Sequence, residues 1–357
     1  MTSYLLAGGG TAGHVNPLLS LADLIKGHEP ESKILTLGTR EGLEASLIPA
    51  RGYELRFVAK LPFPRKPSGY ALSFPGKFLR AVIQVRKLIR DHDVDVVVGF
   101  GGYASAPAYV AARLEKVKLV VHEANALPGI ANKIGARFAD RVAVAFADTP
   151  LPGAVQVGMP LRHEIEEVAQ NRKQADARKH FGLDPDSFTM LVTGGSLGAR
   201  SINETIEASR DLLSAAGVQV LHVVGGKSDL PPLKQKGYLR INYCDRMDLA
   251  ISAADFAVSR AGATTVAELT AIGVPALYLP YAVGNGEQAH NLKSVIQVGG
   301  GITCSDAHFS RDYVARDLVP LLSSSKKLKE MAAAAKSVGI LDGTARLYQI
   351  VRGVLSK

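Results

Sequence analysis

Apolar residues along the chain fall into short runs separated by glycine-rich turns and amphipathic stretches, a pattern typical of parallel strands that alternate with helices. The apolar runs predict strands at residues 3–7, 33–37, 94–100, 118–121, 141–145, 189–193, 218–224, 240–243 and 274–279. Helical spacing predicts helices at residues 16–25, 77–90, 108–114, 164–180 and 346–355. The chain is therefore expected to adopt an α/β fold built on doubly wound parallel sheets.

Two of the glycine-rich turns share one pattern. GGTAG at residues 9–13 and GGSLG at residues 194–198 each follow a predicted strand and precede a helix. Glycines let backbone N–H groups approach an oxyanion, and the start of a helix favours negative charge, so each turn suits a phosphate group. One such turn in each half predicts two Rossmann-like domains, with Gly158 and Pro160 marking the boundary between them.

The segment from residue 258 to residue 291 contains the largest group of candidate binding residues. Its glycine turn leads into a helix in which Glu268 follows Thr265 by three residues. One interpretation is a capping box, in which the glutamate satisfies a backbone N–H group. The other is that the Glu268 carboxylate accepts hydrogen bonds from two ribose hydroxyls while a phosphate lies on the turn before it. Gln288 and Asn291 follow the next strand, and we expect them at the same sheet edge.

Composition narrows the class of protein. Hydrophobic residues make up 47% and charged residues 21% of the 357 positions, which is typical of a globular protein with room for two domains. No apolar run is long enough to cross a bilayer and no leader sequence opens the chain, so we expect a cytosolic protein. Cys244 and Cys304 lack metal-ligand spacing and fit a reducing compartment. The formal charge of +9 favours an anionic partner.

Residues 55–90 carry nine basic and no acidic residues. Four prolines predict a loop before the helix at 77–90, and aromatic residues such as Phe63, Phe74 and Phe78 lie among the basic ones. One interpretation is a solvated basic helix whose apolar face is buried in the core. The other is a peripheral membrane surface, in which apolar side chains enter the lipid interface and basic side chains meet anionic lipid. Nucleic-acid binding is disfavoured because no recognised module is present.

These motifs resemble those of the MurG family, the bacterial peptidoglycan N-acetylglucosaminyltransferases of glycosyltransferase family 28, which have the metal-independent GT-B fold. The resemblance covers the alanine–threonine turn and glutamate of segment 258–291, both glycine turns, and HEAN at residues 122–125. It implies two Rossmann-like domains that face each other across a cleft. Residues 1–160 would form the acceptor and membrane side, residues 161–340 the donor side, and residues 341–357 a helix that crosses back to the first domain.

The resemblance also implies the ligands and the residues that bind them. The donor UDP-N-acetylglucosamine (UDP-GlcNAc) is expected to contact Thr11, Ala12, Gly13, Asn125, Arg162, Ser196, Cys244, Ala263, Thr264, Thr265, Val266, Glu268, Gln288 and Asn291. Cys244 would act through its backbone, since a cysteine is not typical of the family there, and Arg162 has a surface charge as its alternative role. No metal and no cofactor are expected. Region 55–90 is expected to contact an anionic membrane at its cytoplasmic face.

The implied reaction moves N-acetylglucosamine (GlcNAc), with inversion, to the C4 hydroxyl of undecaprenyl-diphosphate-MurNAc-pentapeptide (lipid I), which gives lipid II. His14 is the candidate general base because imidazole takes up a proton near neutral pH, and a structural helix-capping role is its alternative. Glu123 is the second candidate base, and structural hydrogen bonding is the alternative for it.

Three other functions are compatible with the sequence. A related transferase that uses diacylglycerol as its acceptor would need much the same donor site and membrane surface. An NAD(P)-dependent oxidoreductase would bind its cofactor at Gly8, Gly10 and Gly13, which satisfy G-x-G-x-x-G, with Glu41 on the ribose. A nucleotide-sugar sensor would bind the donor without turning it over. A P-loop NTPase is disfavoured because the Walker lysine is missing.

Overall fold

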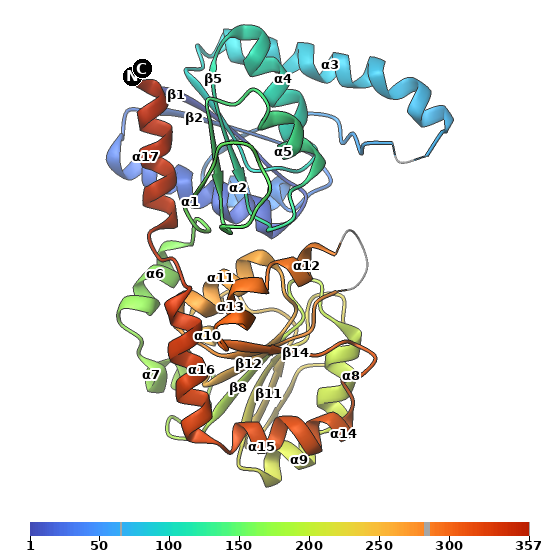
Figure 1. The fold of residues 1–357 in the computed structure, drawn as a ribbon, viewed down its shortest axis with the longest axis vertical. Helices are drawn as coiled ribbons and strands as arrows, with labels where there is room; N and C mark the ends of the chain where they lie inside the picture. Colours follow the sequence, from blue (N-terminus) through green and yellow to red (C-terminus); the bar gives the residue numbers. More distant parts are fainter. Residues whose placement is uncertain (65, 282–285, 357) are drawn as a thin grey trace. The chain divides into compact units, whose positions relative to one another are not determined.

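The computed structural model describes residues 1–64, 66–281 and 286–356, which form two compact units (Figure 1). The first unit comprises Met1–Arg162 together with Asp342–Lys357, and the second comprises His163–Leu341. None of the described helices combines the length and the apolar character that a membrane crossing requires. Arg65, one of the nine basic residues of region 55–90, lies outside the described residues.

The first unit is built on a parallel sheet with the strand order β3-β2-β1-β4-β5-β6-β7. Its strands are β1 (Ser3–Ala7), β2 (Lys33–Gly38), β3 (Glu54–Phe57), β4 (Val96–Gly99), β5 (Lys118–Glu123), β6 (Arg141–Val144) and β7 (Ala154–Gln156). Its helices are α1 (Ala12–His28), α2 (Glu44–Ala50), α3 (Gly69–Asp91), α4 (Ser105–Glu115), α5 (Ile130–Gly135) and α17 (Gly343–Leu355). Helices α1 and α17 share one apolar core with the sheet, and α3 and α4 share the other, so both faces of the sheet are buried.

The second unit repeats this plan with the strand order β10-β11-β9-β8-β12-β13-β14, in which β10 is antiparallel to β11 and the other neighbours are parallel. Its strands are β8 (Thr189–Thr193), β9 (Gln219–Val223), β10 (Leu233–Gln235), β11 (Tyr238–Ile241), β12 (Phe256–Ser259), β13 (Ala276–Tyr278) and β14 (Gly301–Thr303). Its helices are α6 (His163–Gln170), α7 (Gln174–His180), α8 (Arg200–Ala208), α9 (Arg210–Ala215), α10 (Met247–Ala253), α11 (Ala263–Ile272), α12 (Glu287–His290), α13 (Lys293–Gln297), α14 (Arg311–Tyr313), a π-helical turn (Val314–Leu318), α15 (Val319–Leu322) and α16 (Ser325–Ser337).

In both sheets the strand order reverses beside the first strand of the unit. β1 lies between β2 and β4, and β8 lies between β9 and β12. Open α/β sheets bind their ligands at the carboxyl edge next to such a reversal, because the loops there diverge to opposite faces. The two glycine turns leave β1 and β8, so the fold puts each turn at the ligand-binding position of its own sheet.

Most predicted elements are present with small shifts of their ends, and two of these shifts change the candidate site. Helix α1 begins at Ala12 instead of residue 16, so His14 lies in its first turn. Strand β5 extends to Glu123, which makes His122 and Glu123 strand residues. Candidate residues that the sequence assigned to loops are therefore held by regular backbone hydrogen bonds.

Two predicted helices have different bounds for local reasons. Helix α3 begins at Gly69, eight residues before the predicted start, because the Ser68 hydroxyl caps it by accepting a hydrogen bond from the Ala71 N–H at 3.2 Å. The prediction of one helix at 164–180 is wrong, since α6 and α7 are separate. Between them Arg172 leaves the helical path and donates to the Ser252 carbonyl oxygen at 3.0 Å.

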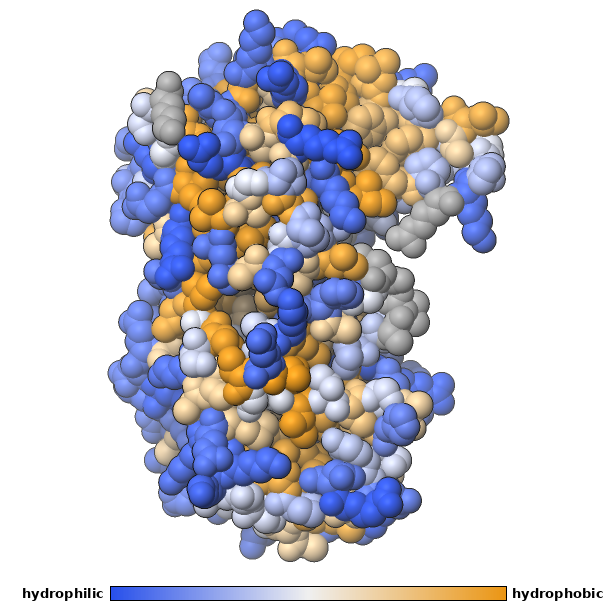
Figure 2. Space-filling view, viewed as in Figure 1, coloured by the Kyte–Doolittle hydropathy of each residue, from blue (hydrophilic) through white to orange (hydrophobic). Residues whose placement is uncertain are grey.

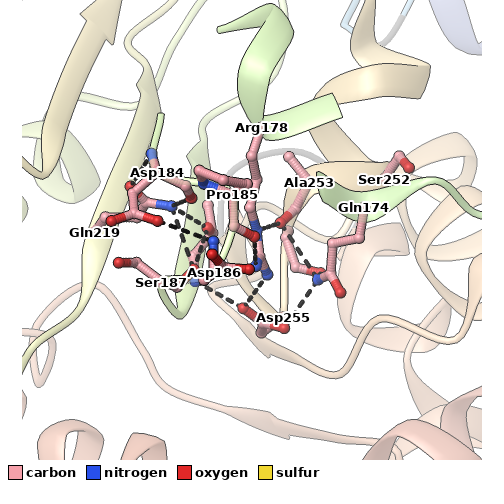
Figure 3. Close-up of polar contacts among 12 residues, drawn as sticks. Gln174, Arg178, Asp184, Pro185, Asp186, Ser187, Gln219, Ser252, Ala253 and Asp255 are labelled. Carbon is pink, nitrogen blue, oxygen red and sulfur yellow. Dashed lines mark hydrogen bonds and ion pairs between the residues drawn. The ribbon is translucent and has the colours of Figure 1, made fainter. Parts of the chain in front are cut away.

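A network of polar residues ties the start of the second unit to the loop between α10 and β12 (Figure 3). The Asp255 carboxylate accepts hydrogen bonds from the Thr189 N–H at 2.7 Å, from Gln174 at 2.8 Å and from the Arg178 guanidinium at 2.6 Å. Arg178 also donates to the Ala253 carbonyl oxygen at 3.0 Å. Arg178 is only 6% exposed, so the pair replaces lost hydration with direct contacts.

Replacement of Arg178 by alanine is expected to lower the free energy of unfolding of the second unit by about 3 kcal/mol, because it leaves the Asp255 carboxylate without its charged partner. Urea denaturation of the full chain measures this loss. Arg200→Ala is the matched control, since the Arg200–Glu204 ion pair is fully solvated and contributes little. Equal denaturation midpoints for the two variants would contradict the stabilising role of Arg178.

Candidate functional site

The glycine turns after β1 and β4 lie against each other in the first unit. Gly102 has a φ of +83°, and a Cβ atom there would lie 2.3 Å from the Gly9 carbonyl oxygen. Only glycine fits, so the two backbones touch. The Ser105 hydroxyl lies 2.9 Å from the Ala7 carbonyl oxygen and 2.7 Å from that of Gly101, within hydrogen-bond distance of both. The first glycine turn is thus fixed to the second.

His14 lies in the first turn of α1, and the preceding glycine turn orients its ring. Its Nδ1 atom lies 2.9 Å from the Gly9 carbonyl oxygen and 3.4 Å from the Thr11 hydroxyl. A carbonyl oxygen can only accept, so Nδ1 carries the hydrogen, and in the neutral ring Nε2 holds the lone pair. A Cβ atom at Gly101 would lie 3.3 Å from Nε2, which places this lone pair at the second glycine turn. The half-buried ring is therefore arranged as a proton acceptor.

Glu44, which no sequence pattern marks as a candidate, lies completely buried behind the first glycine turn. Its carboxylate accepts hydrogen bonds from the Gly10 N–H at 2.7 Å and from the N–H and hydroxyl of Thr39, both at 2.8 Å. It therefore occupies a backbone donor that the pyrophosphate of a dinucleotide would use. Glu41, the candidate ribose acid of a dinucleotide enzyme, lies in an exposed turn. Both observations disfavour the oxidoreductase.

Glu123 ends β5, and hydrogen-bond donors surround its carboxylate. Oε1 accepts from the Asn125 N–H at 2.8 Å, and Oε2 accepts from the Gly129 N–H at 3.0 Å and from the Asn132 amide at 2.9 Å. The Asn132 side chain is held in turn by the Tyr109 hydroxyl, which donates to it at 2.6 Å. Glu123 thus shapes the loop that carries Asn125, and this geometry favours its structural role over that of a base.

His122 precedes Glu123 on β5 and is completely buried. Its Nε2 atom lies 3.2 Å from the Gly158 carbonyl oxygen, to which it donates. Burial lowers the pKa of His122 to about 4, so the ring is neutral at physiological pH. The hydrogen bond ties β5 to the segment at the end of the first unit, and His122 has a structural role there.

In the second unit, Gln288 and Asn291 converge on the turn between β12 and α11. The Gln288 side-chain oxygen accepts from the Ala261 N–H at 3.2 Å and from the Tyr281 N–H at 2.9 Å. The Asn291 amide donates to the Ala261 carbonyl oxygen at 3.2 Å and is completely buried. Both side chains reach one turn at the carboxyl edge of the sheet, as their spacing predicted, and they are found on α12 and at its end.

Helix α11 begins at Ala263 with Gly262 as its N-cap, so Thr265 lies inside the helix. The capping-box interpretation of Glu268 is therefore wrong, because it requires Thr265 at the cap. Among the described residues, the buried hydroxyl oxygen of Thr264 has no hydrogen-bond partner. A buried hydroxyl without a partner is unfavourable, so its place at the start of α11 suits a ligand that supplies one. Glu268, 5% exposed, lies one turn further along the helix.

Arg260 supports the same turn and was also missed in the sequence. Its guanidinium donates to the Leu279 carbonyl oxygen at 3.0 Å, to the Asp306 carboxylate at 2.9 Å and to the Ser201 hydroxyl at 3.1 Å. These partners lie just after β13, in the loop after β14 and in α8, so Arg260 joins three segments that are distant in the sequence. Its neighbours in the chain predicted a turn, and no spacing pattern linked it to Asp306.

The other candidate residues are placed in separate loops. Ser196 is exposed, and its carbonyl oxygen accepts a hydrogen bond from the Gly226 N–H at 3.0 Å. Cys244 is buried just after β11. Arg162 is half-buried and is the last residue of the first unit before α6, whereas Asn125 follows β5.

Within each unit the candidates gather at the carboxyl edge of the sheet. The first unit carries Thr11, Ala12, Gly13, His14 and Asn125 there, and the second carries Ser196, Cys244, the start of α11, Gln288 and Asn291. The described part of the chain contains no group of three or more histidine, cysteine, aspartate or glutamate side chains that could hold a metal ion.

Apolar side chains gather on the surface of the first unit over α3 (Figure 2). Leu72, Leu79 and Ile83 are 87%, 57% and 52% exposed. Beside them the Phe74 ring packs against Phe63 and Phe78, with centroid distances of 5.5 Å and 5.7 Å. The prediction that the apolar stripe of this helix faces the core holds only for its second half, where Val82, Val85 and Ile89 are buried.

The basic residues of the same region divide into two groups. Arg86 and Arg90 pair with Glu115, Lys87 pairs with Asp91, and Arg56 pairs with Glu54. Within the described residues, Lys60, Lys66, Lys77 and Arg80 form no ion pair. Uncompensated positive charge therefore lies at the first half of α3 and in the loop before it, next to the exposed apolar side chains.

Comparison with known proteins identifies the family. Residues 4–144 match the glycosyltransferase family 28 N-terminal domain, and residues 189–347 match the glycosyltransferase family 28 C-terminal domain. Two relatives are named UDP-N-acetylglucosamine--N-acetylmuramyl-(pentapeptide) pyrophosphoryl-undecaprenol N-acetylglucosamine transferase. The Clavibacter sepedonicus protein is 55% identical over 100% of this chain and 97% of its own length, and the Leifsonia xyli protein is 53% identical over 100% and 99%. The crystal structure of Acinetobacter baumannii MurG has a similar fold, with a TM-score of 0.78 and 24% identity over 99% of this chain and 100% of that one.

Proposed function

The chain belongs to glycosyltransferase family 28, and from this premise we propose that it transfers GlcNAc from UDP-GlcNAc to undecaprenyl-diphosphate-MurNAc-pentapeptide. The named relatives, similar over the whole chain, carry this activity in their names. Two Rossmann-like units give the chain the GT-B fold. The enzyme is thus a UDP-GlcNAc-dependent transferase of peptidoglycan synthesis, and its product is lipid II.

The observation that carries the donor assignment is the turn before α11, with the buried, unpartnered hydroxyl of Thr264 among the described residues. We assign the diphosphate to the first N–H groups of α11, where the Thr264 hydroxyl supplies a further donor. Glu268 is assigned to the ribose, since a carboxylate accepts from two adjacent hydroxyls. Gln288 and Asn291 fix the turn through Ala261 and are assigned to the sugar and diphosphate.

The first unit is assigned to the acceptor and to the proton transfer. In the inverting step the acceptor O4 forms a bond to the anomeric carbon while the bond from that carbon to the UDP oxygen breaks. The hydroxyl proton passes to Nε2 of His14, whose lone pair is available because Nδ1 donates to the Gly9 carbonyl oxygen. The charge that develops on UDP is stabilised by the start of α11 and by Arg162.

The surface formed by the first half of α3 and the loop before it is assigned to the cytoplasmic face of an anionic membrane. Exposed Leu72 and Leu79 supply apolar area for the lipid interface. Lys66, Lys77 and Arg80 form no ion pair with described residues and supply charge for anionic headgroups. A lipid-linked acceptor is confined to such a surface, so binding the membrane brings the enzyme to its substrate.

The decisive test measures UDP release from UDP-GlcNAc by the purified chain, with and without a short-chain lipid I analogue. We expect release that depends on the analogue. At donor concentrations below saturation, we expect Glu268→Ala to lower this release at least about tenfold by weakening donor binding, since a buried charged acceptor of two hydroxyls is lost. Glu330→Ala, which removes an exposed glutamate of α16, is the matched control.

Diacylglycerol as a second acceptor and direct binding of UDP-GlcNAc and NAD(P) complete the test, and three outcomes would replace the proposal. Release with diacylglycerol but not with the lipid I analogue would establish the other acceptor. Donor binding without release under either condition would identify a nucleotide-sugar sensor. Binding of NAD(P) in place of UDP-GlcNAc would return the oxidoreductase to first place.

Removal of the proposed base tests the mechanism separately. His14→Ala is expected to lower kcat by about 100-fold or more, because general-base assistance of this kind contributes at least that much. The affinity for UDP-GlcNAc should change little, since most of the residues assigned to the donor lie in the second unit. Calorimetric titration and steady-state kinetics give the two values, and an unchanged kcat would remove His14 from the mechanism.

The membrane assignment predicts a selective loss of vesicle binding. Leu72→Asp combined with Leu79→Asp should reduce cosedimentation with phosphatidylglycerol vesicles at least about tenfold. Each change removes apolar area that would enter the lipid interface and adds a charge that anionic headgroups repel. Val298→Asp, at an exposed apolar side chain of the second unit, is the control and should bind normally. Release of UDP with a water-soluble acceptor analogue should be unaffected in all variants, which shows that each is correctly folded. Equal vesicle binding by the double variant and the unaltered protein would contradict the membrane assignment.

A further inference from the structure

One peptide group lies between a buried carboxylate and the ring of His14. The Gly9 carbonyl and the Gly10 N–H belong to the same peptide bond. The carbonyl oxygen lies 2.9 Å from His14 Nδ1, and the N–H donates to Glu44 Oε2 at 2.7 Å. Because the peptide is conjugated, an anion on its N–H draws electron density toward its oxygen and strengthens the hydrogen bond there. Glu44 and His14 are thus linked through two short hydrogen bonds.

The position of Glu44 is enforced by three glycines. A Cβ atom would lie 2.3 Å from Oε1 if placed at Gly9, 1.9 Å from Oε2 at Gly42 and 2.5 Å from Cγ at Gly38. Thr39 fixes Oε1 with two further hydrogen bonds, and the whole side chain is inaccessible to solvent. Glu44 therefore has one available placement, with Oε2 directed at the Gly10 N–H.

From this geometry we infer that Glu44 is a positioning residue that holds His14 in its reactive form through the Gly9–Gly10 peptide. The inference rests on the proposed role of His14 as the general base. The polarised Gly9 carbonyl keeps the hydrogen on Nδ1 and leaves Nε2 as the acceptor. When Nε2 takes the acceptor proton, the same carbonyl and the carboxylate behind it stabilise the imidazolium. A buried carboxylate thus supports the histidine without touching it.

A purely structural role for Glu44 predicts a different result, namely a less stable fold with an unaltered ring in the protein that does fold. The distinguishing property is the tautomer of His14, which ¹⁵N NMR of the ring nitrogens reports directly. In the uniformly labelled full chain at a pH where the ring is neutral, we expect the Nδ1–H form, with the resonances assigned by comparison with His14→Gln. An Nε2–H ring in the unaltered protein would overturn the inference without any variant of Glu44.

The variant Glu44→Gln keeps the size of the side chain and removes its charge. We expect Nε2–H to become populated, kcat to fall at least about tenfold and the KM for UDP-GlcNAc to stay within about twofold. Glu41→Gln is the matched control, since it removes an exposed carboxylate from the turn just before α2 and should leave all three values unchanged. Unchanged tautomer and kcat in a folded Glu44→Gln protein would overturn the inference.

The two proposals fail in different ways. A His14→Ala enzyme with full turnover would refute the assignment of His14 as the base. If the His14 tautomer nevertheless changed in Glu44→Gln, the link between Glu44 and His14 would stand. A slow His14→Ala enzyme together with a ring insensitive to Glu44→Gln would uphold the base and refute the link.

Discussion

The close approach of glycine backbones at the strand-order reversal of each sheet is the constraint on which the candidate site depends. In the first unit Gly102 leaves room for the Gly9 carbonyl, and in the second a Cβ atom at Gly198 would lie 2.1 Å from the Val224 carbonyl oxygen. Turns packed this tightly fix the start of the helix that follows and the direction of its N–H groups. Any larger residue would separate the turns and misalign both helix ends, so the ligand positions and the fold share one requirement.

Several polar side chains hydrogen-bond to backbone groups of the loops at the carboxyl edges of the two sheets. Glu44 and Glu123 accept hydrogen bonds from loop N–H groups, and Gln288 and Asn291 hold the two sides of Ala261. Such contacts reduce the reorganisation that a site needs during reaction, because donors are already aimed at the ligand. Under the proposed function, these polar residues would contribute through rigidity, and a substitution there is expected to affect chemistry and stability together.

The basic residues of α3 differ between its two halves in whether acidic residues neutralise them. Basic residues in the second half of α3 are neutralised by acidic neighbours such as Glu115, whereas Lys77 and Arg80 in its first half have no acidic partner among the described residues. The uncompensated charge is therefore concentrated beside exposed apolar side chains. In the proposed membrane contact, attraction to an anionic surface and burial of apolar area would therefore act at one place.

The sequence by itself determined the α/β class, the two glycine turns and most strands, because apolar runs and glycine positions are local signals. It also determined that Gln288 and Asn291 reach one sheet edge. Only the tertiary structure decided that Glu44 lies behind the first glycine turn, that Glu123 is enclosed by donors and that Thr265 is not a cap. The Gly10 N–H that orients Glu44 is 34 residues away, and spacing in a sequence carries no information about such a contact. The donors around Glu123 are near it in the chain, and Thr265 lies just past the Gly262 cap, but the local backbone conformations that decide both have no periodic signature.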